Sequence, residues 1–473
     1  MREYLLAMVV AIAVTLLLGG PIRELAVKLG VVGVVRDRDV HKVPTPRVGG
    51  IAMFGGLVVA FTLANHFPML HAKAYANSNT MQAILWGAFL VVLLGVIDDK
   101  WELGALVKLA GQIFAASVMV VNGVQLTWLP IPFYGQLALD PTFGVVLSVL
   151  IVLVLMNAVN FVDGLDGLAA GIVCIAAVAT FAYCYRLAIS YKLTGAVTPA
   201  LISIVTVGIC VGFLGHNWSP ARIFMGDTGS MLLGLLLAAS AISITGQIDP
   251  SLFSQSIGGN GGLSQSQTIH KLVPTYLPLL LPISVTVLPL ADMFMAVVRR
   301  TKAGRSPLAA DKQHMHHRLL QIGHSDRRAV LIMYFWAALV AFVTVLVAAS
   351  PQRRPIVFLA IAMTLVGLLM LLGPRLGDHR DRLRKAARNA KPDRWRTEPA
   401  SPARHRAGAM PQSSVKSSQV PAVSIPAIKQ PDSMPAGESV ATAEGALPQD
   451  PAGAPAGPPA NGGMRRRHRT LSG

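Results

Sequence analysis

A chain of 473 residues with 53% hydrophobic and 14% charged residues is too apolar for a soluble protein, because soluble domains carry about 25% charged residues. The mean hydropathy of +0.54 agrees, and the sequence predicts an all-α, polytopic membrane protein. The formal charge of +18 favours anionic partners, but no fold or aromatic platform accompanies the arginines, so nucleic acid is not an expected partner.

Eleven apolar runs are long enough to cross about 30 Å of hydrocarbon, which takes roughly 18 residues. The predicted spans, in chain order, are 3–20, 49–67, 80–97, 103–122, 143–159, 167–185, 197–214, 228–246, 273–298, 328–349 and 355–373. The fourth is the least apolar, because Lys108 and Gln112 interrupt it. No cleavage site follows the first run, and basic residues come after it, which predicts an uncleaved helix.

The distribution of basic residues predicts the orientation of the spans. Lys and Arg collect in the loops after the first and ninth runs, which places both loops in the cytoplasm. The amino terminus is then outside and the carboxyl terminus inside. Each of the five loops that follow an odd-numbered run faces the cytoplasm and carries a polar motif. These motifs are HKVPTPRVGG (41–50), IDDKWELGALVKLAGQ (97–112), NAVNFVDGLDG (157–167), HNWSPARIFMGDTGS (216–230) and DKQHMHHR (311–318). The sequence therefore predicts one active surface at the inner leaflet.

The composition changes beyond residue 373, and 374–473 is rich in Pro, Ala, Ser, Gly and Arg. This composition is typical of disorder, because it buries too little apolar surface to fold. The tail holds 17 Lys and Arg against 8 Asp and Glu, so it supplies +9 of the chain's +18. Its proximal basic cluster is expected to touch anionic lipid, with ordinary positive-inside bias as the alternative. The sequence thus predicts a transmembrane domain over 1–373 and a disordered cytoplasmic tail over 374–473.

Two acidic motifs are candidates for chemistry. Asp98 and Asp99 end the third run side by side, and adjacent carboxylates repel each other unless they share a cation or a proton. This favours a divalent metal or a general base, with a solvated helix end as the alternative. Asp227 lies in MGDTGS, where Gly226 and Gly229 permit close backbone approach at the start of the eighth run. Such a turn can hold a metal carboxylate next to a phosphate, or it can be an ordinary N-cap.

A cluster of amides and carboxylates ends the fifth run. Asn157 and Asn160 are three residues apart, and so are Asp163 and Asp166, which puts each pair on one side of its turn. Amide and carboxylate groups together can bind a nucleobase edge and ribose hydroxyls. The alternative is a polar network that ties helix ends together.

The last cytoplasmic motif is rich in histidine. Its candidate residues are His314, His316, His317 and Arg318. The histidines are zinc ligands by type, but H-x-H-H lacks a fourth partner and lies among basic residues. A cationic clamp on a pyrophosphate fits better, and Lys42, Arg47 and Lys108 extend its positive rim.

In these motifs and their order, residues 1–375 resemble the polyprenyl-phosphate N-acetylhexosamine-1-phosphate transferases of glycosyltransferase family 4. The resemblance implies that Asp98, Asp99 and Asp227 are catalytic and hold Mg²⁺, with Mn²⁺ as a substitute. The candidate nucleotide- and substrate-binding residues are Lys42, Arg47, Asn157, Asn160, Asp163, Asp166, Asn217, Phe224, His314, His316, His317 and Arg318. The bilayer is an implied partner, and a homodimer is left open.

Within this family, HKVPTPR and the single H-x-H-H loop look more like the N-acetylglucosamine-1-phosphate branch, in particular the actinobacterial type that uses decaprenyl phosphate. The implied reaction is attack by a polyprenyl phosphate oxygen on the β-phosphorus of UDP-N-acetylglucosamine, with release of UMP. It would be the first membrane step of a cell-envelope polysaccharide linker. The site would lie on the cytoplasmic face of the plasma membrane.

Two alternatives remain at this point. The chain could instead transfer phospho-N-acetylmuramoyl-pentapeptide, which the nucleotide preference of the purified protein decides. It could also be a divalent-cation transporter whose aspartates bind the cargo. Transporters place coupling sites near the middle of the membrane, often between repeated halves, whereas these carboxylates cluster at one face without an internal repeat.

The composition of the tail generates the first testable prediction. Deletion of residues 386–473 is expected to leave catalysis in detergent largely intact, because a disordered segment outside the motifs has no part in the chemistry. The measurement is the turnover of the truncated and full-length proteins side by side. A large loss of turnover in the truncated protein would show that the tail contributes to the reaction.

Overall fold

The computed structural model describes residues 1–28, 45–76, 78–131, 135–190, 192–247, 298, 301–302, 304, 324–349 and 355–371. The described chain is mostly helical, with one short β-hairpin. Most of the ninth predicted span, the histidine motif, Lys42 and the tail lie outside these residues.

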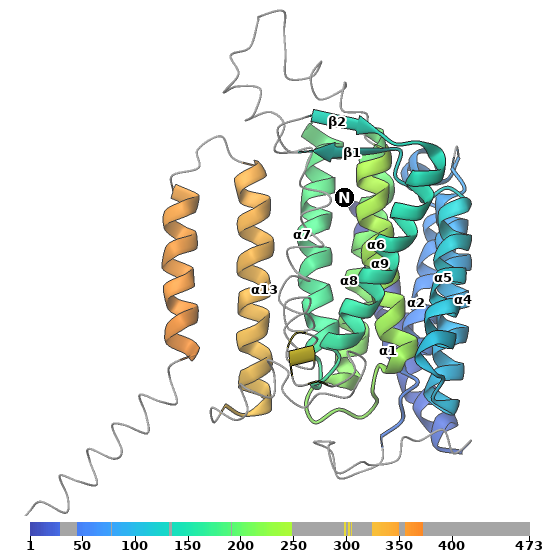
Figure 1. Ribbon diagram of the computed structural model, residues 1–473, viewed down its shortest axis with the longest axis vertical. Helices are drawn as coiled ribbons and strands as arrows, with labels where there is room; N and C mark the ends of the chain where they lie inside the picture. Colours follow the sequence, from blue (N-terminus) through green and yellow to red (C-terminus); the bar gives the residue numbers. More distant parts are fainter. Residues whose placement is uncertain are drawn as a thin grey trace, which may run out of the picture. The chain divides into compact units, whose positions relative to one another are not determined.

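The elements follow one another along the chain with short connections (Figure 1). They are α1 (Arg2–Lys28), α2 (Gly49–Ala64), α3 (Pro68–Leu70), the π-helix η1 (His71–Tyr75), α4 (Thr80–Trp101), α5 (Ala105–Val121), β1 (Trp128–Ile131), β2 (Gly135–Ala138), α6 (Pro141–Val162), α7 (Leu168–Ser190), the 3-10 helix η2 (Thr194–Ala196), α8 (Val197–Asn217), α9 (Gly226–Gln247), α13 (Asp326–Ala349) and the helix Pro355–Leu371. In the hairpin, β1 and β2 pair antiparallel, with Trp128 opposite Ala138. Ten of the eleven predicted runs coincide with helices, and the remaining run falls almost wholly outside the described residues.

The helices confirm a polytopic membrane protein. Among the described residues, seven helices are long and apolar enough to cross a membrane. An eighth span results if α2 is counted together with Pro68–Tyr75, to which it is joined at a bend of 86°. α5 and Pro355–Leu371 are apolar but shorter. The total of eleven spans and the sides on which the termini lie remain predictions.

α9 is the helix around which the others pack. It contacts α2, α4, α6 and α8, and its apolar window is completely buried. A helix that is apolar on all sides is stable only when other helices surround it. Further contacts join α1 to α2 and α8, and α13 lies against α7 (Figure 1). Any side chain at the start of α9 is therefore held by several helices at once.

Glycines let two helices approach the first turn of α9 closely. A Cβ atom on Gly95 of α4 would overlap the backbone of Thr228, and one on Gly50 of α2 would overlap the backbone of Gly229. Small residues at such points allow helix backbones to touch, which strengthens packing in a membrane. This contact brings the carboxyl end of α4 to the amino end of α9.

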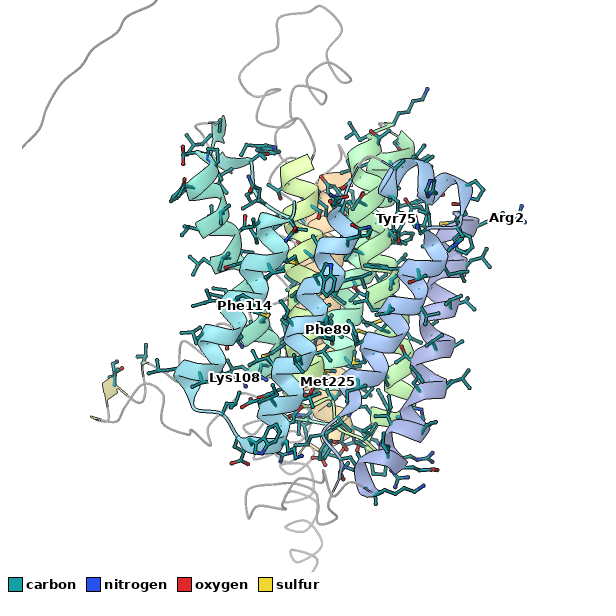
Figure 2. All side chains as sticks on the ribbon, turned by 90° about the vertical axis from the view of Figure 1, so that its right-hand side faces the viewer. Arg2, Tyr75, Phe89, Lys108, Phe114 and Met225 are labelled. Carbon is teal, nitrogen blue, oxygen red and sulfur yellow. The ribbon has the colours of Figure 1, made fainter. Side chains whose placement is uncertain are left out.

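α5 explains why the fourth predicted span is poorly apolar. Its polar residues Lys108 and Gln112 do not face lipid: Gln112 is buried, and Lys108 forms ion pairs with two carboxylates. Exposed apolar residues such as Leu106 and Phe114 cover other parts of the helix. In Figure 2, Lys108 lies towards the same end of the bundle as Met225, whereas Tyr75 lies towards the opposite end.

The contact between α4 and α9 predicts a strong effect of added volume. Gly95→Val is expected to destabilise the protein by at least about 1–3 kcal/mol, because the new side chain meets backbone that cannot move aside. Thermal unfolding in detergent measures this loss. Gly20→Val is the matched control, since a Cβ atom there meets nothing within 4 Å. Equal melting temperatures for the two variants would contradict the close contact.

Candidate functional site

Lys108 joins two carboxylates at one end of the bundle. Its Nζ atom lies 2.9 Å from Asp98 Oδ2, and it donates a short hydrogen bond to Asp227 Oδ2. The side chains of Lys108, Asp98 and Asp227 are 20%, 8% and 27% exposed. Charges this far from water are stable only when they are paired. The three residues come from α5, α4 and α9, so the pairing fixes three helix ends together.

The end of α4 determines how Lys108 reaches Asp98. Glu102 adopts a left-handed conformation with φ of 49° and ends the helix. The backbone N–H of Leu103 then donates a hydrogen bond of 2.8 Å to Asp98 Oδ1. α5 begins two residues later and carries Lys108 back over the end of α4. Both oxygens of Asp98 are thus bound, one to the backbone and one to Lys108.

Asp99 caps the first turn of α9. Its carboxylate accepts hydrogen bonds from the N–H groups of Asp227 and Thr228, at 3.0 and 3.2 Å, and from the Thr228 hydroxyl at 2.7 Å. A carboxylate at a helix amino terminus satisfies free N–H groups and interacts favourably with the helix dipole. The sequence left these amides open as a phosphate site or a self-capping turn, and the structure gives them to Asp99.

Gly226 is required next to this cap. Its φ is +68°, and a Cβ atom there would overlap the carbonyl oxygen of Arg47 and approach the carboxylate of Asp99. The segment around Arg47 is held beside it by backbone hydrogen bonds, in which Phe224 donates to Pro46 at 2.8 Å and Gly49 donates to Phe224 at 3.0 Å. The first cytoplasmic motif therefore lies against the entry to α9.

Asn160 belongs to the same cluster, and Asn157 does not contact it. The Nδ2 atom of Asn160 donates to Asp227 Oδ1 and to Ser230 Oγ, the latter at 2.9 Å. Asn157, one turn earlier on α6, donates to Gln112 at 2.9 Å and to Leu153. Asn157 thus forms the helix-tying network that the sequence left as an alternative, whereas Asn160 reaches the acidic cluster.

A second group of contacts joins the turn after α6 to the loop after α8. Asp166 Oδ2 accepts from the N–H of Ala221 at 3.0 Å. Asn217 is buried; its Oδ1 accepts from Gly167 N–H at 2.9 Å, and its Nδ2 donates to the Ile223 carbonyl at 3.0 Å. With both ends of its amide occupied, Asn217 holds the two loops together. Phe224 follows in the same loop.

Asp163 ends α6 among these carboxylates. Its withdrawal from water raises its pKa to about 7, and repulsion from Asp227, Asp99 and Asp166 adds to the rise. The positive charge of Arg47 offsets part of this effect. Asp163 is therefore the carboxyl group of this turn that changes charge near neutral pH.

The acidic cluster fits a magnesium ion. Among the described residues, no group of three or more His, Cys, Asp or Glu side chains is arranged to hold a metal by itself. Mg²⁺, however, usually takes one or two carboxylates and completes its shell with water and substrate phosphates. Asp227 and Asp98 supply two carboxylates that already share one cation, and the Asn160 amide carries a further oxygen.

The structure brings together most of the residues predicted from the sequence. Asp98, Asp99, Asn160 and Asp227 form one connected cluster, and Asp163, Asp166 and Asn217 lie in the adjacent loops. Lys42, His314, His316, His317 and Arg318 lie outside the described residues. Sequence reasoning placed Lys108 only on a positive rim and missed its pairing with Asp98 and Asp227. The signal was present as a lysine inside an apolar run, ten residues after Asp98.

Comparison with known proteins agrees with this geometry. Residues 81–245, which include Asp98, Asn160 and Asp227, match the family model described as glycosyl transferase family 4. The decaprenyl-phosphate N-acetylglucosaminephosphotransferase of Mycobacterium tuberculosis (strain ATCC 25618 / H37Rv) is 42% identical over 347 residues, which is 72% of this chain and 82% of that protein. The chain belongs to glycosyl transferase family 4.

Other relatives carry related names. The decaprenyl-phosphate N-acetylglucosaminephosphotransferase of Mycobacterium leprae (strain TN) is 40% identical over 347 residues, 72% of this chain and 83% of that protein. The probable undecaprenyl-phosphate N-acetylglucosaminyl 1-phosphate transferase of Bacillus subtilis (strain 168) is 33% identical over 334 residues, 71% of this chain and 82% of that protein. The family resemblance predicted from the motifs is confirmed.

The environment of Asp163 predicts how stability depends on pH. Its carboxyl binds a proton more tightly in the folded protein, so ionisation between its ordinary pKa of 3.8 and about 7 costs stability. The melting temperature of wild type should therefore fall relative to Asp163→Asn as pH rises from 5 to 8. Thermal unfolding of both proteins across this range, in EDTA, tests the sign. A wild type that gains stability over Asp163→Asn as pH rises would contradict it.

Proposed function

We propose that this chain transfers N-acetylglucosamine 1-phosphate from UDP-N-acetylglucosamine to decaprenyl phosphate and releases UMP. The observation that carries the proposal is the cluster of Asp98, Lys108, Asn160 and Asp227 at one end of the helices, within the region that matches the family. The names of the relatives with 40–42% identity supply the substrates. The product would begin a lipid-linked cell-envelope polysaccharide.

The reaction brings two anions together. A phosphate oxygen of the lipid attacks the β-phosphorus of the nucleotide sugar, and the bond from this phosphorus to the oxygen that bridges to UMP breaks. Mg²⁺, with Mn²⁺ as a substitute, would be held by Asp227 and Asp98 with the Asn160 oxygen, and it would neutralise the diphosphate and the leaving UMP. Lys108 adds a fixed positive charge beside the same position.

Asp98 and Asp99 have different proposed roles. The Asp98 carboxylate faces the cluster, so we assign to it the deprotonation or positioning of the lipid phosphate. Asp99 is used by the backbone of α9 and positions Asp227 through the first turn of that helix. On this assignment Asp99 is a positioning residue, and its place among the metal ligands, predicted from the sequence, passes to Asp98.

The nucleotide would bind next to the acidic cluster. The turn 163–167 and the loop that carries Asn217 and Phe224 present amides, carboxylates and an aromatic ring, which suit a uridine. Arg47 adds positive charge near Asp163. His314, His316, His317, Arg318 and Lys42 keep their predicted role of holding the diphosphate.

The location of the site follows from the lipid substrate. The phosphate of a polyprenyl chain lies at the membrane surface, and the cluster lies at the ends of α4, α5, α6 and α9. The positive-inside bias of the sequence makes this the cytoplasmic face of the plasma membrane. The homodimer stays a prediction, which the mass of the protein in detergent tests.

The decisive experiment measures UMP release. Purified protein receives Mg²⁺, decaprenyl phosphate and UDP-N-acetylglucosamine, with the UDP-N-acetylmuramoyl-pentapeptide in a parallel reaction and EDTA as a control. The proposal expects UMP from the first nucleotide only and its loss in EDTA. UMP from the pentapeptide nucleotide instead would move the chain to the other branch. Consumption of neither nucleotide by folded protein would refute the activity, and metal uptake into vesicles would then test the transporter.

The cluster generates a prediction about two substitutions. Asp98→Asn and Asp227→Asn are each expected to lower turnover at least about a hundredfold, the scale of lost acid-base or charge-stabilising groups. Asp140→Asn is the matched control, because Asp140 only caps α6 by accepting a hydrogen bond from Thr142, a role that asparagine also fills. Turnover near that of wild type in Asp98→Asn or Asp227→Asn would remove that residue from the site.

A further inference from the structure

Tyr334 of α13 reaches across to the turn that follows α6. Its hydroxyl donates a hydrogen bond to the carbonyl oxygen of Gly167, and its ring lies 6.5 Å from the ring of Trp218. Gly171, on the first turns of α7, leaves the space for this ring, because a Cβ atom there would overlap Tyr334. The tyrosine is thus seated between α7 and the loop after α8.

The peptide that Tyr334 binds is also held from the other side. The N–H of Gly167 donates to Asn217, while its carbonyl accepts from Tyr334. Gly167 has φ of +76°, a conformation that glycine adopts readily. Two buried or half-buried side chains from different helices therefore fix one residue of the turn 163–167, and this turn carries Asp163 and Asp166.

α13 makes a second contact with the same pair of loops. The guanidinium of Arg327 donates to the carbonyl oxygen of Ser219 through Nε at 3.1 Å and Nη2 at 2.7 Å. Ser219 lies two residues before Ala221, whose N–H is bound by Asp166. α13 consequently braces both the turn 163–167 and the loop 218–223, although it contributes nothing to the cluster around Lys108.

We propose that Tyr334 is a positioning residue for the nucleotide: its bond to Gly167 holds the turn 163–167 in the conformation that binds the uridine diphosphate end of the substrate. This inference rests on the proposed function. The turn is fixed before substrate arrives, so the binding energy is not spent on ordering it. Because Tyr334 is remote from the cluster of Asp98 and Asp227, its loss acts on nucleotide binding and leaves the chemical step unchanged.

The test compares Tyr334→Phe with wild type. The variant keeps the ring in its seat and loses only the hydroxyl. We expect the KM for UDP-N-acetylglucosamine to rise about three- to tenfold, the effect of one lost hydrogen bond. The kcat and the KM for decaprenyl phosphate should stay within about twofold of wild type, because neither involves the turn. The Kd for UDP, measured by calorimetry, should rise with the KM.

Tyr75→Phe is the matched control. The Tyr75 hydroxyl also donates to a backbone carbonyl, that of Phe61 at 2.7 Å, but at the opposite end of the bundle (Figure 2). It loses the same kind of bond without touching the turn, so its KM for the nucleotide should equal that of wild type. Gly171→Ala is a second perturbation, since it displaces the Tyr334 ring, and it should raise the same KM.

The outcomes separate the inference from the proposed function. An unchanged nucleotide KM and UDP Kd in Tyr334→Phe would overturn the positioning role, while wild type still releases UMP. An equal rise in Tyr75→Phe would also overturn it, because the effect would then reflect general stability. A wild type that releases no UMP from UDP-N-acetylglucosamine would refute the proposed function and this inference together.

Discussion

The pairing of Lys108 with Asp98 and Asp227 is the interaction on which the site depends. Three charges lie at the ends of three helices, where each alone would carry a large desolvation penalty. Their pairing stabilises them together and fixes the relative positions of α4, α5 and α9. Asn160 adds α6 to the same cluster through Asp227. The result is a preorganised, partly exposed acidic site, which is the arrangement that phosphoryl transfer between two anions needs.

Much of the fold could be predicted from the sequence, because apolar length and charge distribution are strong signals in membrane proteins. The predicted runs coincide with helices throughout the described residues. The polar motifs at 97–112, 157–167 and 216–230 meet at one end, as their shared cytoplasmic assignment predicts. Boundaries were less predictable: α6 continues to Val162 and therefore carries Asn157 and Asn160 on its last turns.

The roles of single residues could not be predicted, because they depend on contacts between helices that no local pattern encodes. The adjacent residues Asp98 and Asp99 look equivalent in the sequence, yet one pairs with Lys108 and the other caps α9. Asn157 and Asn160 diverge in the same way, since one binds Gln112 and the other binds Asp227. A helix turns by about 100° per residue, so neighbours face different partners.

The most direct test of this account is a double-mutant cycle on turnover with Lys108→Met and Asp227→Asn, measured on folded protein. If the two residues act as one unit, each single variant loses at least about a hundredfold, and the double variant is no more than about threefold worse than the poorer single. Losses that multiply would show independent roles. Turnover near that of wild type in Lys108→Met would contradict the claim that the lysine-centred cluster is the reaction site.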